Sequence, residues 1–546
     1  MVSYSHKGGA LFMGNKADLD SLSREEAIEM CKKLMKQNAD LEKNCNIYLE
    51  QLKKNKQKMF GKSTEKSSLI LQDELQLFDE ADVMAEQDKE EESVNIAEYK
   101  RRKKKKYTID NLPKNVEKEY IEYDLEDKQC PSCGNQMHKI KVEERYEIKM
   151  IPARVKLIVH QIPVYACRKC QKKGSGTLIK AEGPAMLFPK SPASASLVSY
   201  LMDMKYNKGV PIYRIEQSMK QEGILFPRNT YARWLIESSD QYLEKVYDQM
   251  HKHLLKEEII HADETKHTVF TDGRKDSKTK NTYVWTFRTG AYAEHPIVLY
   301  VHKGGRKGEI AETFLEDYDN YLLTDDYAGY NGVKAIRVLC HAHVRRKFAD
   351  IVKGQKGAGS VEVAKEVIHK YQKIFSTDTA IRERNAQNFE MIKNDRNKEI
   401  RPLMDELFTY LKDTKPKTAQ KTEIYKAINY ALDNEKELYR YFDDGRLELT
   451  NNLAERSQKP VIIGRKNSMF LGSSRGAQSS AVIYSIVQSA KENELIPQKY
   501  LEYLLEELPK IVQNECFIER DFEEYLPWSP TIPEQCKAKT EVKSKQ

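Results

Sequence analysis

Long apolar runs are missing from this sequence of 546 residues, although hydrophobic residues make up 40% of it. No stretch approaches the roughly 20 apolar residues that a membrane-spanning helix needs. The segment from Met1 to Leu19 has only Lys7 and Lys16 as basic residues and no apolar core, so it does not resemble a secretion signal. We therefore expect no membrane partner and a cytoplasmic location.

Cysteine is also scarce, with nine residues in the whole chain, which excludes a fold held together by dense disulfides. Four of the nine form two CxxC pairs, one at Cys130 and Cys133 and the other at Cys167 and Cys170. Each pair can present two thiolates from one turn, so that four sulfurs can surround a zinc ion tetrahedrally. The sequence therefore predicts a structural Zn²⁺ site, with free thiols or redox pairs as the alternatives.

The chain has little excess of positive over negative charge, since its formal net charge is only +8. A protein of this size carries such an excess without binding anything acidic. The distribution is more informative, since residues 73–92 are largely acidic and residues 100–106 are all lysine or arginine. Clustered cations gain affinity by releasing counterions from phosphates, so Lys103, Lys104 and Lys105 are candidate nucleic-acid contacts. A solvated linker is the alternative.

The N-terminal region, residues 1–60, has the pattern of a helical coiled coil. Four positions recur at seven-residue spacing, namely Ala27, Leu34, Leu41 and Tyr48. Such a seam predicts a homodimer or a higher oligomer, although an amphipathic helix docked on its own domain shows a similar pattern. We expect an acidic and then basic linker over 61–108, followed by the four-cysteine zinc-binding module over 109–185.

Residues 186–250 are predicted to be helical and to resemble a helix-turn-helix. The segment from Tyr213 to Gly223 and the segment from Arg228 to Ile236 would be its two helices. The N-terminal side chains of a second, recognition helix face a DNA groove, which makes Arg228 and Arg233 candidate DNA contacts. Helical hairpins with a glycine turn also occur in protein cores, so packing is the alternative.

The pattern changes to strands over residues 251–350. Strands are expected at 259–270, 282–288 and 297–302, then a helix over 309–317, a strand ending at Asp325 and another at 336–340. Strands followed by a helix and further strands predict a mixed α/β sheet. Residues 351–440 are charged and helical and look like an insertion. Residues 441–512 would then complete the domain, and 513–546 would form a C-terminal tail.

Three acidic residues stand at positions suited to metal binding. Asp263 lies within a strand that looks buried, Asp325 follows another such strand, and Glu455 stands near the start of a predicted helix. Metal-assisted cleavage of phosphodiesters needs hard oxygen ligands that hold two cations about 4 Å apart. With 83 acidic residues in the chain, spacing alone also allows surface roles for these three. It equally allows three neighbouring acids in their place, namely Glu264, Asp326 and Glu448.

Ordered motifs along nearly the whole chain resemble the insertion sequence sixty-six family of bacterial transposases. Before the predicted sheet they are Phe60-Gly61-Lys62-Ser63, Cys130-Pro131-Ser132-Cys133-Gly134, Pro152-Ala153-Arg154, Lys205-Tyr206 and Pro211-Ile212-Tyr213-Arg214. From the first strand onwards they are His261-Ala262-Asp263-Glu264-Thr265, Thr324-Asp325-Asp326-Tyr327-Ala328-Gly329-Tyr330, His343-Val344-Arg345-Arg346-Lys347-Phe348, Asn451-Asn452-Leu453-Ala454-Glu455-Arg456 and Gly464-Arg465-Lys466-Asn467.

The resemblance implies a multidomain α/β protein with a ribonuclease H-like catalytic domain. This domain would be a mixed sheet with helices, and the helical insertion would divide it into two parts of the sequence. A coiled coil, a zinc-ribbon-like module and a helix-turn-helix-like region precede it. Carried over residue by residue, the family's DDE triad falls on Asp263, Asp325 and Glu455, which would bind Mg²⁺ or Mn²⁺. The family usually has glycine in place of Asp326 and aspartate in place of Thr450. Neither departure removes a ligand of the triad.

Basic residues near the triad are further candidate DNA contacts. Five of them follow the strand of Asp325 or accompany Glu455 on its helix, namely Arg345, Arg346, Arg456, Arg465 and Lys466. They suit a clamp on the DNA backbone and neutralisation of phosphates near the scissile bond, with a solvated helix face as the alternative. His341 and His343 are expected to pack or to form hydrogen bonds inside the domain rather than to bind metal.

Together these features predict a nucleoid-associated transposase that binds the terminal inverted repeats of its own insertion sequence. It would cleave DNA strands at these ends with the help of the metal and join them to target DNA. The resemblance also suggests small accessory proteins of the same element as partners. The alternatives are a DNA-binding regulator without catalysis and a ribonuclease H-like nuclease of repair or RNA. The presence of all three acids argues against the first, and the upstream modules argue against the second.

Overall fold

The computed structural model describes residues 155–166, 178–181, 183–189, 191–271, 280–354, 358–468, 471–512 and 522–538. The chain divides into two compact units, and most described residues belong to the unit formed by Tyr99–Asp350 and Val363–Gln546. Outside the described residues lie the predicted coiled coil, the basic run with Lys103, Lys104 and Lys105, and the cysteines Cys130, Cys133, Cys167 and Cys170.

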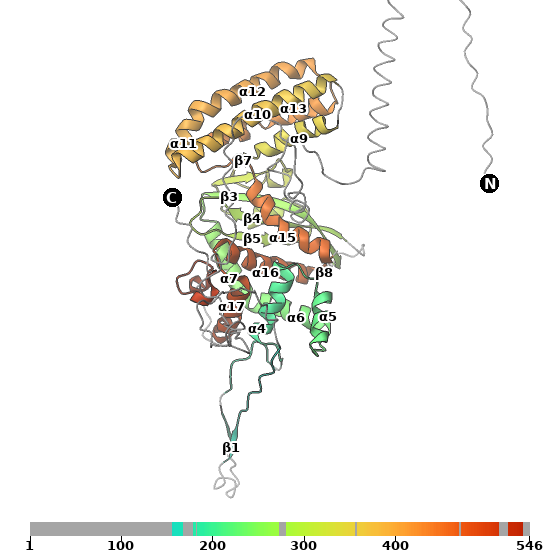
Figure 1. Cartoon of the computed structure of the whole chain (residues 1–546), viewed down its shortest axis with the longest axis vertical. Coiled ribbons are helices and arrows are strands. Elements are labelled where there is room, and N and C mark those ends of the chain that lie inside the picture. The colour runs from blue at the N-terminus through green and yellow to red at the C-terminus, as the bar shows by residue number, and fades with distance from the viewer. Residues whose placement is uncertain are drawn as a thin grey trace, which may run out of the picture. The chain divides into compact units, whose positions relative to one another are not determined.

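A mixed sheet organises the larger unit (Figure 1). Its strands are β3 (Ile259–Thr271), β4 (Lys280–Thr289), β5 (Val298–Val301), β6 (Tyr321–Thr324), β7 (Ile336–Leu339) and β8 (Leu471–Ser473). The spatial order is β5-β4-β3-β6-β7, and β8 pairs with β3. Strands β3, β4 and β5 are antiparallel neighbours, whereas β6 runs parallel to β3 and β7 parallel to β6. The mixed sheet with helices that the sequence predicts is therefore confirmed.

Strand β5 lies at one edge of the sheet, where helix α16 (Ser474–Glu492) packs against it. The backbone N–H groups of Val298 and Tyr300 donate hydrogen bonds to the hydroxyls of Ser489 and Ser485, at 3.0 and 2.8 Å. Small serine and alanine side chains on α16 allow this close approach. The amides of the edge strand are therefore satisfied by a helix rather than by another strand.

A helical layer extends the core beneath α16 (Figure 1). Its members include α4 (Ala195–Met202), α7 (Glu244–Leu254) and α17 (Pro497–Val512). The apolar face of α17 repeats at helical spacing, and its four leucines Leu501, Leu504, Leu505 and Leu508 are buried. Burying each such side chain contributes about 1.5–3 kcal/mol, so amphipathic packing holds α17 against α4 and α16.

Two further helices, α5 (Ile212–Gln221) and α6 (Arg228–Ser238), form the segment predicted to resemble a helix-turn-helix. Gly223 turns the chain between them with a φ of +82°, a conformation that glycine adopts without strain. The N–H of Arg228, at the start of α6, donates to Oε1 of Glu216 on α5 at 3.2 Å. A side chain of one helix therefore caps the other and fixes their angle.

Helices occupy the described residues from α9 to α14, and this segment lies beyond β7 (Figure 1). They are α9 (His341–Lys353), α10 (Ala358–Asn385), α11 (Phe389–Asp395), α12 (Arg401–Thr414), α13 (Glu423–Asp433) and α14 (Glu435–Tyr439). A buried ionic cluster joins α10 to the residues that follow α11. Asp378 accepts hydrogen bonds from Arg382 at 3.0 Å and from Arg396 at 2.9 Å. Both arginines also donate to the carbonyl oxygen of Leu447, which ties the segment to the chain before α15.

Three smaller features complete the described chain. Strands β1 (Val164–Ala166) and β2 (Leu178–Lys180) form an antiparallel pair. The helix expected over 309–317 ends earlier, as α8 (Glu309–Phe314), because Asp317 adopts a left-handed φ of +67° that no helix can contain. Among the described helices, none is both long enough and apolar enough to cross a membrane.

Candidate active site

Asp263 and Asp325 lie side by side on neighbouring parallel strands. The register of β3 and β6 pairs Ile260 with Leu322 and His261 with Leu323. Two residues further along, Asp263 stands level with Asp325, which directly follows the end of β6. Residues at the same level of two parallel strands point to the same face of the sheet. Strand pairing alone therefore brings these two carboxyl groups together.

Each of the two aspartates is oriented by a backbone amide close to it in sequence. Oδ1 of Asp263 accepts a hydrogen bond from the N–H of Glu264 at 2.9 Å. Oδ1 of Asp325 accepts one from the N–H of Tyr327 at 3.0 Å, in the turn that an aspartate side chain typically makes with its own chain. Both side chains are half-buried, so they remain open to a ligand.

Helix α15 (Asn452–Ser468) brings Glu455 to the same place. The side-chain amide of Asn451, just before the helix, donates to the carbonyl oxygen of Ala262 at 2.7 Å. The carbonyl oxygen of Asn451 accepts the first helical bond, from the N–H of Glu455 at 3.1 Å. The helix therefore begins directly beside the residue that precedes Asp263, and Glu455 lies in its first turn.

The pKa of Asp263 is affected by the acidic residues around it. Burial raises the pKa of Asp263 well above its usual range, and the charges of Glu264, Glu455 and Asp325 raise it further. Both Glu455 and Asp325 are remote from Asp263 in the chain, so their influence comes from the fold alone. A site with this much negative charge favours a cation.

The donor chemistry fits a hard divalent cation, because three carboxylates supply oxygen ligands and gain from its charge. Oε1 of Glu455 is buried and has no hydrogen-bond partner among the described residues. Within the described part of the chain, no group of three or more histidine, cysteine, aspartate or glutamate side chains is already close enough to hold a metal.

Two basic side chains flank Glu455. Nε2 of His343 lies 3.7 Å from Oε1, and a guanidinium nitrogen of Arg346 lies 3.5 Å from Oε2. Burial lowers the pKa of His343, although the charge of Glu455 opposes that shift. Both residues belong to the first turns of α9, so the helix after β7 places them over the acids.

The three alternative acids point to other partners. Glu264 is an ion-pair partner of Arg306, and its other oxygen accepts a hydrogen bond from the hydroxyl of Tyr330 at 2.9 Å. Oδ2 of Asp326 accepts a hydrogen bond from the amide of Asn434 at 3.0 Å. Oε2 of Glu448 lies 3.2 Å from Nε2 of His261. Each of these acids therefore has a polar partner of its own, although the charge of Glu264 still acts on Asp263.

An open cleft of about 330 Å³ lies next to Asp325. Three basic side chains line it, namely Arg306, Arg346 and Lys347, together with Asp325, Asp326, Tyr327, His343, Asp350 and Tyr430. Nζ of Lys347 lies 4.0 Å from the ring centre of Tyr430 on α13. A cleft with this lining can take a ligand that carries phosphate groups.

Family models match this chain over most of its length. The model described as the transposase IS66 family matches residues 190–479, which include all three acids and the described sheet. The zinc-finger binding domain of transposase IS66 matches residues 127–171. A third model, described as transposase C of IS166 homeodomain, matches residues 47–121. The chain belongs to the IS66 family of transposases.

Relatives of this IS66 transposase include three uncharacterized proteins of Sinorhizobium fredii. The protein y4jD is 30% identical over 77% of this chain and 81% of its own length. The proteins y4hP and y4qI are each 26% identical, over 73% and 75% of this chain and 73% and 76% of their own lengths. Family membership implies DNA binding and an enzyme that cleaves and transfers DNA, and the zinc-finger match suggests metal use.

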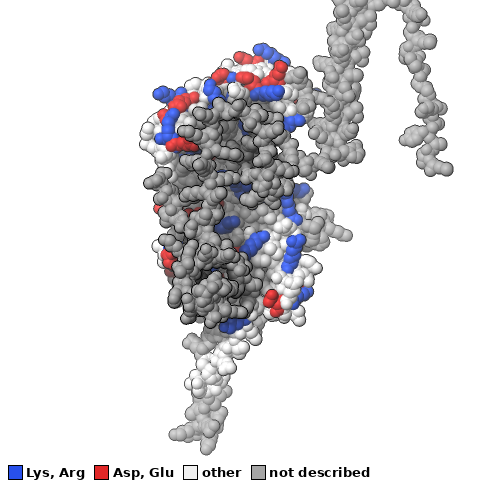
Figure 2. Space-filling model, viewed as in Figure 1, with Lys and Arg blue, Asp and Glu red and all other residues white. Residues whose placement is uncertain are grey.

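The structure separates the basic residues of the transposase into two groups. Exposed are Arg228 and Arg233 on α6, Arg346 on α9, and Arg456 and Lys466 on α15. Arg345 and Arg465 are half-buried, and Arg465 donates a hydrogen bond to the carbonyl oxygen of Lys266 on β3. In Figure 2 lysine and arginine side chains gather on the visible face over α15 and α6, whereas the helical segment carries both signs.

Sequence reasoning missed two residues at the cleft of the transposase. Arg306, in the loop after β5, pairs with Glu264 and lies 3.8 Å from the ring centre of Tyr327. Tyr430 comes from the helical segment, whose pattern gives no sign of a contact with the sheet. A basic residue between glycines, in Gly304-Gly305-Arg306-Lys307-Gly308, is the one signal that pointed to Arg306.

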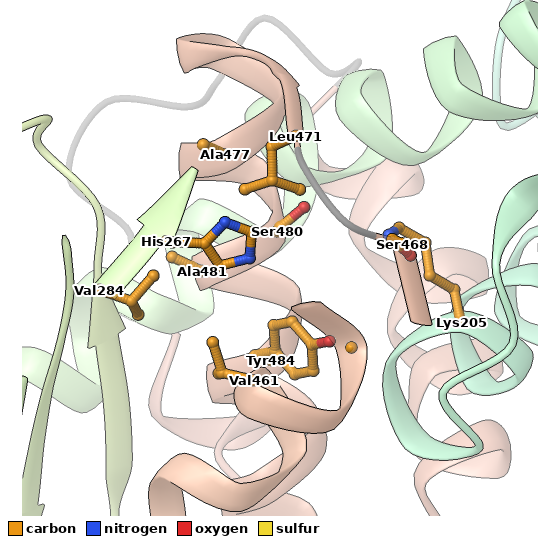
Figure 3. Close-up of a pocket in the computed structure, with 11 residues that line it drawn as sticks. Lys205, His267, Val284, Val461, Ser468, Leu471, Ala477, Ser480, Ala481 and Tyr484 are labelled. Atoms are coloured by element: carbon orange, nitrogen blue, oxygen red, sulfur yellow. The ribbon is translucent and has the colours of Figure 1, made fainter. Parts of the chain in front are cut away.

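A second, smaller cavity lies further along β3 (Figure 3). Its volume of about 20 Å³ suits a single water molecule. His267, Ser480 and Tyr484 surround it, and burial lowers the pKa of Lys205 at its rim to about 8. A Cβ atom at Gly464 would meet the hydroxyl of Tyr484, so a larger residue there would have to displace that side chain. The lining contains no carboxylate, so this cavity is distinct from the candidate active site.

Proposed function

We propose that this chain is a DDE transposase that cleaves DNA at the terminal inverted repeats of its own insertion sequence and joins the ends to target DNA. The residues assigned to catalysis are Asp263, Asp325 and Glu455. One observation carries the proposal: the register of β3 and β6 sets Asp263 level with Asp325, and α15 begins beside this strand with Glu455 in its first turn. The raised pKa of Asp263, caused by burial and by the charges of neighbouring acids, agrees with this arrangement. The sheet order, with antiparallel β3 to β5 followed by parallel β6 and β7, is compatible with a ribonuclease H-like fold.

The three carboxylates would hold Mg²⁺ or Mn²⁺. When bound, the metal supplies activation of a water or hydroxyl nucleophile and stabilisation of the leaving oxygen. The chain's own part is to position phosphates, because phosphoryl transfer asks little covalent chemistry of side chains. Arg346 and Lys347 line the cleft beside Asp325, where they can hold a phosphate near the acids.

Further DNA contacts are proposed on exposed helices and outside the described residues. Arg228 and Arg233 on α6 would read or hold the terminal repeat, while Arg456 and Lys466 on α15 would meet the backbone. The basic run with Lys103, Lys104 and Lys105 would add affinity, and Cys130, Cys133, Cys167 and Cys170 would bind a structural Zn²⁺. A coiled coil would support a homodimer or higher oligomer, and accessory proteins of the element remain proposed partners.

The decisive experiment combines cleavage and strand transfer on DNA that carries an element end, with Mg²⁺ or Mn²⁺. We expect Asp263→Asn, Asp325→Asn and Glu455→Gln each to lose cleavage while keeping end binding. Asp319→Asn is the matched control, because this exposed acid lies on the same domain before β6. Retained cleavage in any triad variant would contradict the assignment. Binding without cleavage by the unchanged chain would favour a regulator, and cleavage without joining would favour a nuclease.

A further inference from the structure

His261 lies two residues before Asp263 and is completely buried, yet it touches two polar side chains from a distant part of the sequence. Its Nδ1 lies 3.1 Å from Oδ1 of Asn451, and its Nε2 lies 3.2 Å from Oε2 of Glu448. Asn451 is itself 1% exposed. This core histidine is therefore held by a hydrogen bond at Nδ1 and has a carboxylate as the neighbour of its Nε2.

The hydrogen bonds fix which atoms donate. The amide nitrogen of Asn451 donates to the carbonyl oxygen of Ala262, so its Oδ1 is the atom that faces His261. An amide oxygen only accepts, which requires the proton of the ring on Nδ1. Nε2 of His261 and Oε2 of Glu448 face each other but form no hydrogen bond among the described residues, so this contact is attractive only when one of the two carries a proton. These contacts form a chain from Glu448 through His261 and Asn451 to the backbone of β3.

We propose that His261 and Glu448 are positioning residues for the carboxylate of Glu455. They act through Asn451, which sets the place where α15 begins on β3. Because Glu455 follows Asn451 by four residues, it lies one helical turn above the residue that they hold. A shift of Asn451 away from Ala262 therefore moves Glu455 away from Asp263. This inference rests on the proposed function of the three acids.

The test measures Mn²⁺ binding to the purified full chain by calorimetry, together with kcat and KM for cleavage of an element end. His261→Leu removes both contacts, whereas His261→Asn keeps a donor toward Asn451. Glu448→Leu removes only the contact at Nε2, and Glu448 is partly exposed. His267→Leu is the matched control, because His267 is a buried histidine further along the same strand. Circular dichroism and the unfolding midpoint identify the variants that fold.

We expect His261→Leu and Glu448→Leu to raise the Kd for Mn²⁺ by about tenfold or more and to lower kcat rather than raise KM, as loss of groups that orient ligands does. His261→Asn should recover most of the affinity, and His267→Leu should match the unchanged protein. Folded His261→Leu or Glu448→Leu protein with unchanged Mn²⁺ affinity would overturn the inference. So would His261→Asn protein that is folded but as impaired as His261→Leu.

A parallel measurement on Asp263→Asn separates this inference from the proposed function. If that variant loses Mn²⁺ binding and cleavage while the His261 and Glu448 variants behave like the unchanged protein, only the positioning role fails. If Asp263→Asn binds Mn²⁺ and cleaves normally, the proposed function fails and takes the positioning role with it.

Discussion

Nε of Arg306 donates a hydrogen bond to Oε1 of Glu264 across 3.1 Å, and the Glu264 side chain is only 2% exposed. The hydroxyl of Tyr330 donates to the other oxygen of the same carboxylate. A buried carboxylate in the middle of β3 is thus satisfied from the loop after β5 and from the turn after Asp325. This pair fastens two loops of the cleft to the central strand.

Replacing Arg306 with methionine should leave the Glu264 carboxylate buried without its charged donor. We expect the free energy of unfolding to fall by about 1.5–3 kcal/mol, the range for a hydrogen bond to a charged group. Urea unfolding followed by circular dichroism measures this loss. The double variant with Glu264→Gln should lose less than the sum of the two single variants, and strictly additive losses would show that the pair does not interact.

Replacing Lys347 with alanine should weaken DNA binding without regard to sequence. If Lys347 neutralises one phosphate in the cleft, the slope of log affinity against log salt concentration should drop by about one unit. Fluorescence anisotropy at several salt concentrations measures the slope. Lys365→Ala, an exposed lysine on α10, is the control and should leave the slope unchanged. An unchanged slope in Lys347→Ala would remove this residue from the interface.

Replacing Arg228 with alanine tests the role proposed for α6. If Arg228 contacts a base edge, affinity for the terminal repeat should fall by about 1–3 kcal/mol, and affinity for unrelated DNA should fall less. Competition binding with both DNAs gives the two values. Equal losses on both DNAs would assign Arg228 to the backbone, and no loss on either would leave α6 as a packing element.

Replacing Asp378 with asparagine should destabilise the helical segment. Burial disfavours the carboxylate, but Arg396 and Arg382 outweigh burial, so the pKa of Asp378 is lowered. Breaking such a buried pair costs about 3–5 kcal/mol. Because the folded state lowers the pKa, the contribution is complete above the unfolded pKa of about 4 and disappears as the pH falls further. Unfolding measured from pH 7 to pH 3 should therefore show the gap between the two proteins narrowing, and a constant gap would contradict this account.

Chain purified without chelator should contain about one zinc ion, as a closed site of four thiolates predicts. Cys130→Ser and Cys167→Ser should each lower the zinc content and the unfolding midpoint. Cys536→Ser is the control, because this cysteine is buried near the C-terminus and belongs to neither CxxC pair. Zinc well under one per chain in the unchanged protein would remove the prediction.

Local patterns in the sequence were sufficient for the strands from β3 to β7 and for the type of sheet, whereas the short strand β8 was not expected. Strand β3 was expected over 259–270 and spans Ile259–Thr271, because β-branched residues at its two ends favour an extended backbone even though polar residues interrupt its middle. Local patterns could not decide which of the neighbouring acidic residues belong to the candidate active site. Asp263 and Glu264 are adjacent and chemically alike, and only the resemblance to a family favoured the first. Their separation depends on the sheet, where alternate residues point to opposite faces.

Contacts between distant segments could not be predicted from the sequence. Nothing in the neighbourhood of His261 indicates that Asn451 and Glu448 will meet it, since those contacts exist only after α15 docks on β3. Likewise, Tyr430 reaches the cleft because Arg382 and Arg396 hold the helical segment to Leu447. Such pairings require the three-dimensional arrangement of whole elements.

The serine contacts of α16 with β5 have a consequence for how copies of this protein can meet. The outward N–H groups of Val298 and Tyr300 already donate to Ser489 and Ser485, so this margin of the sheet offers a second molecule no donors at those positions. Two copies of this protein therefore cannot continue the sheet from one into the other through these two positions of β5.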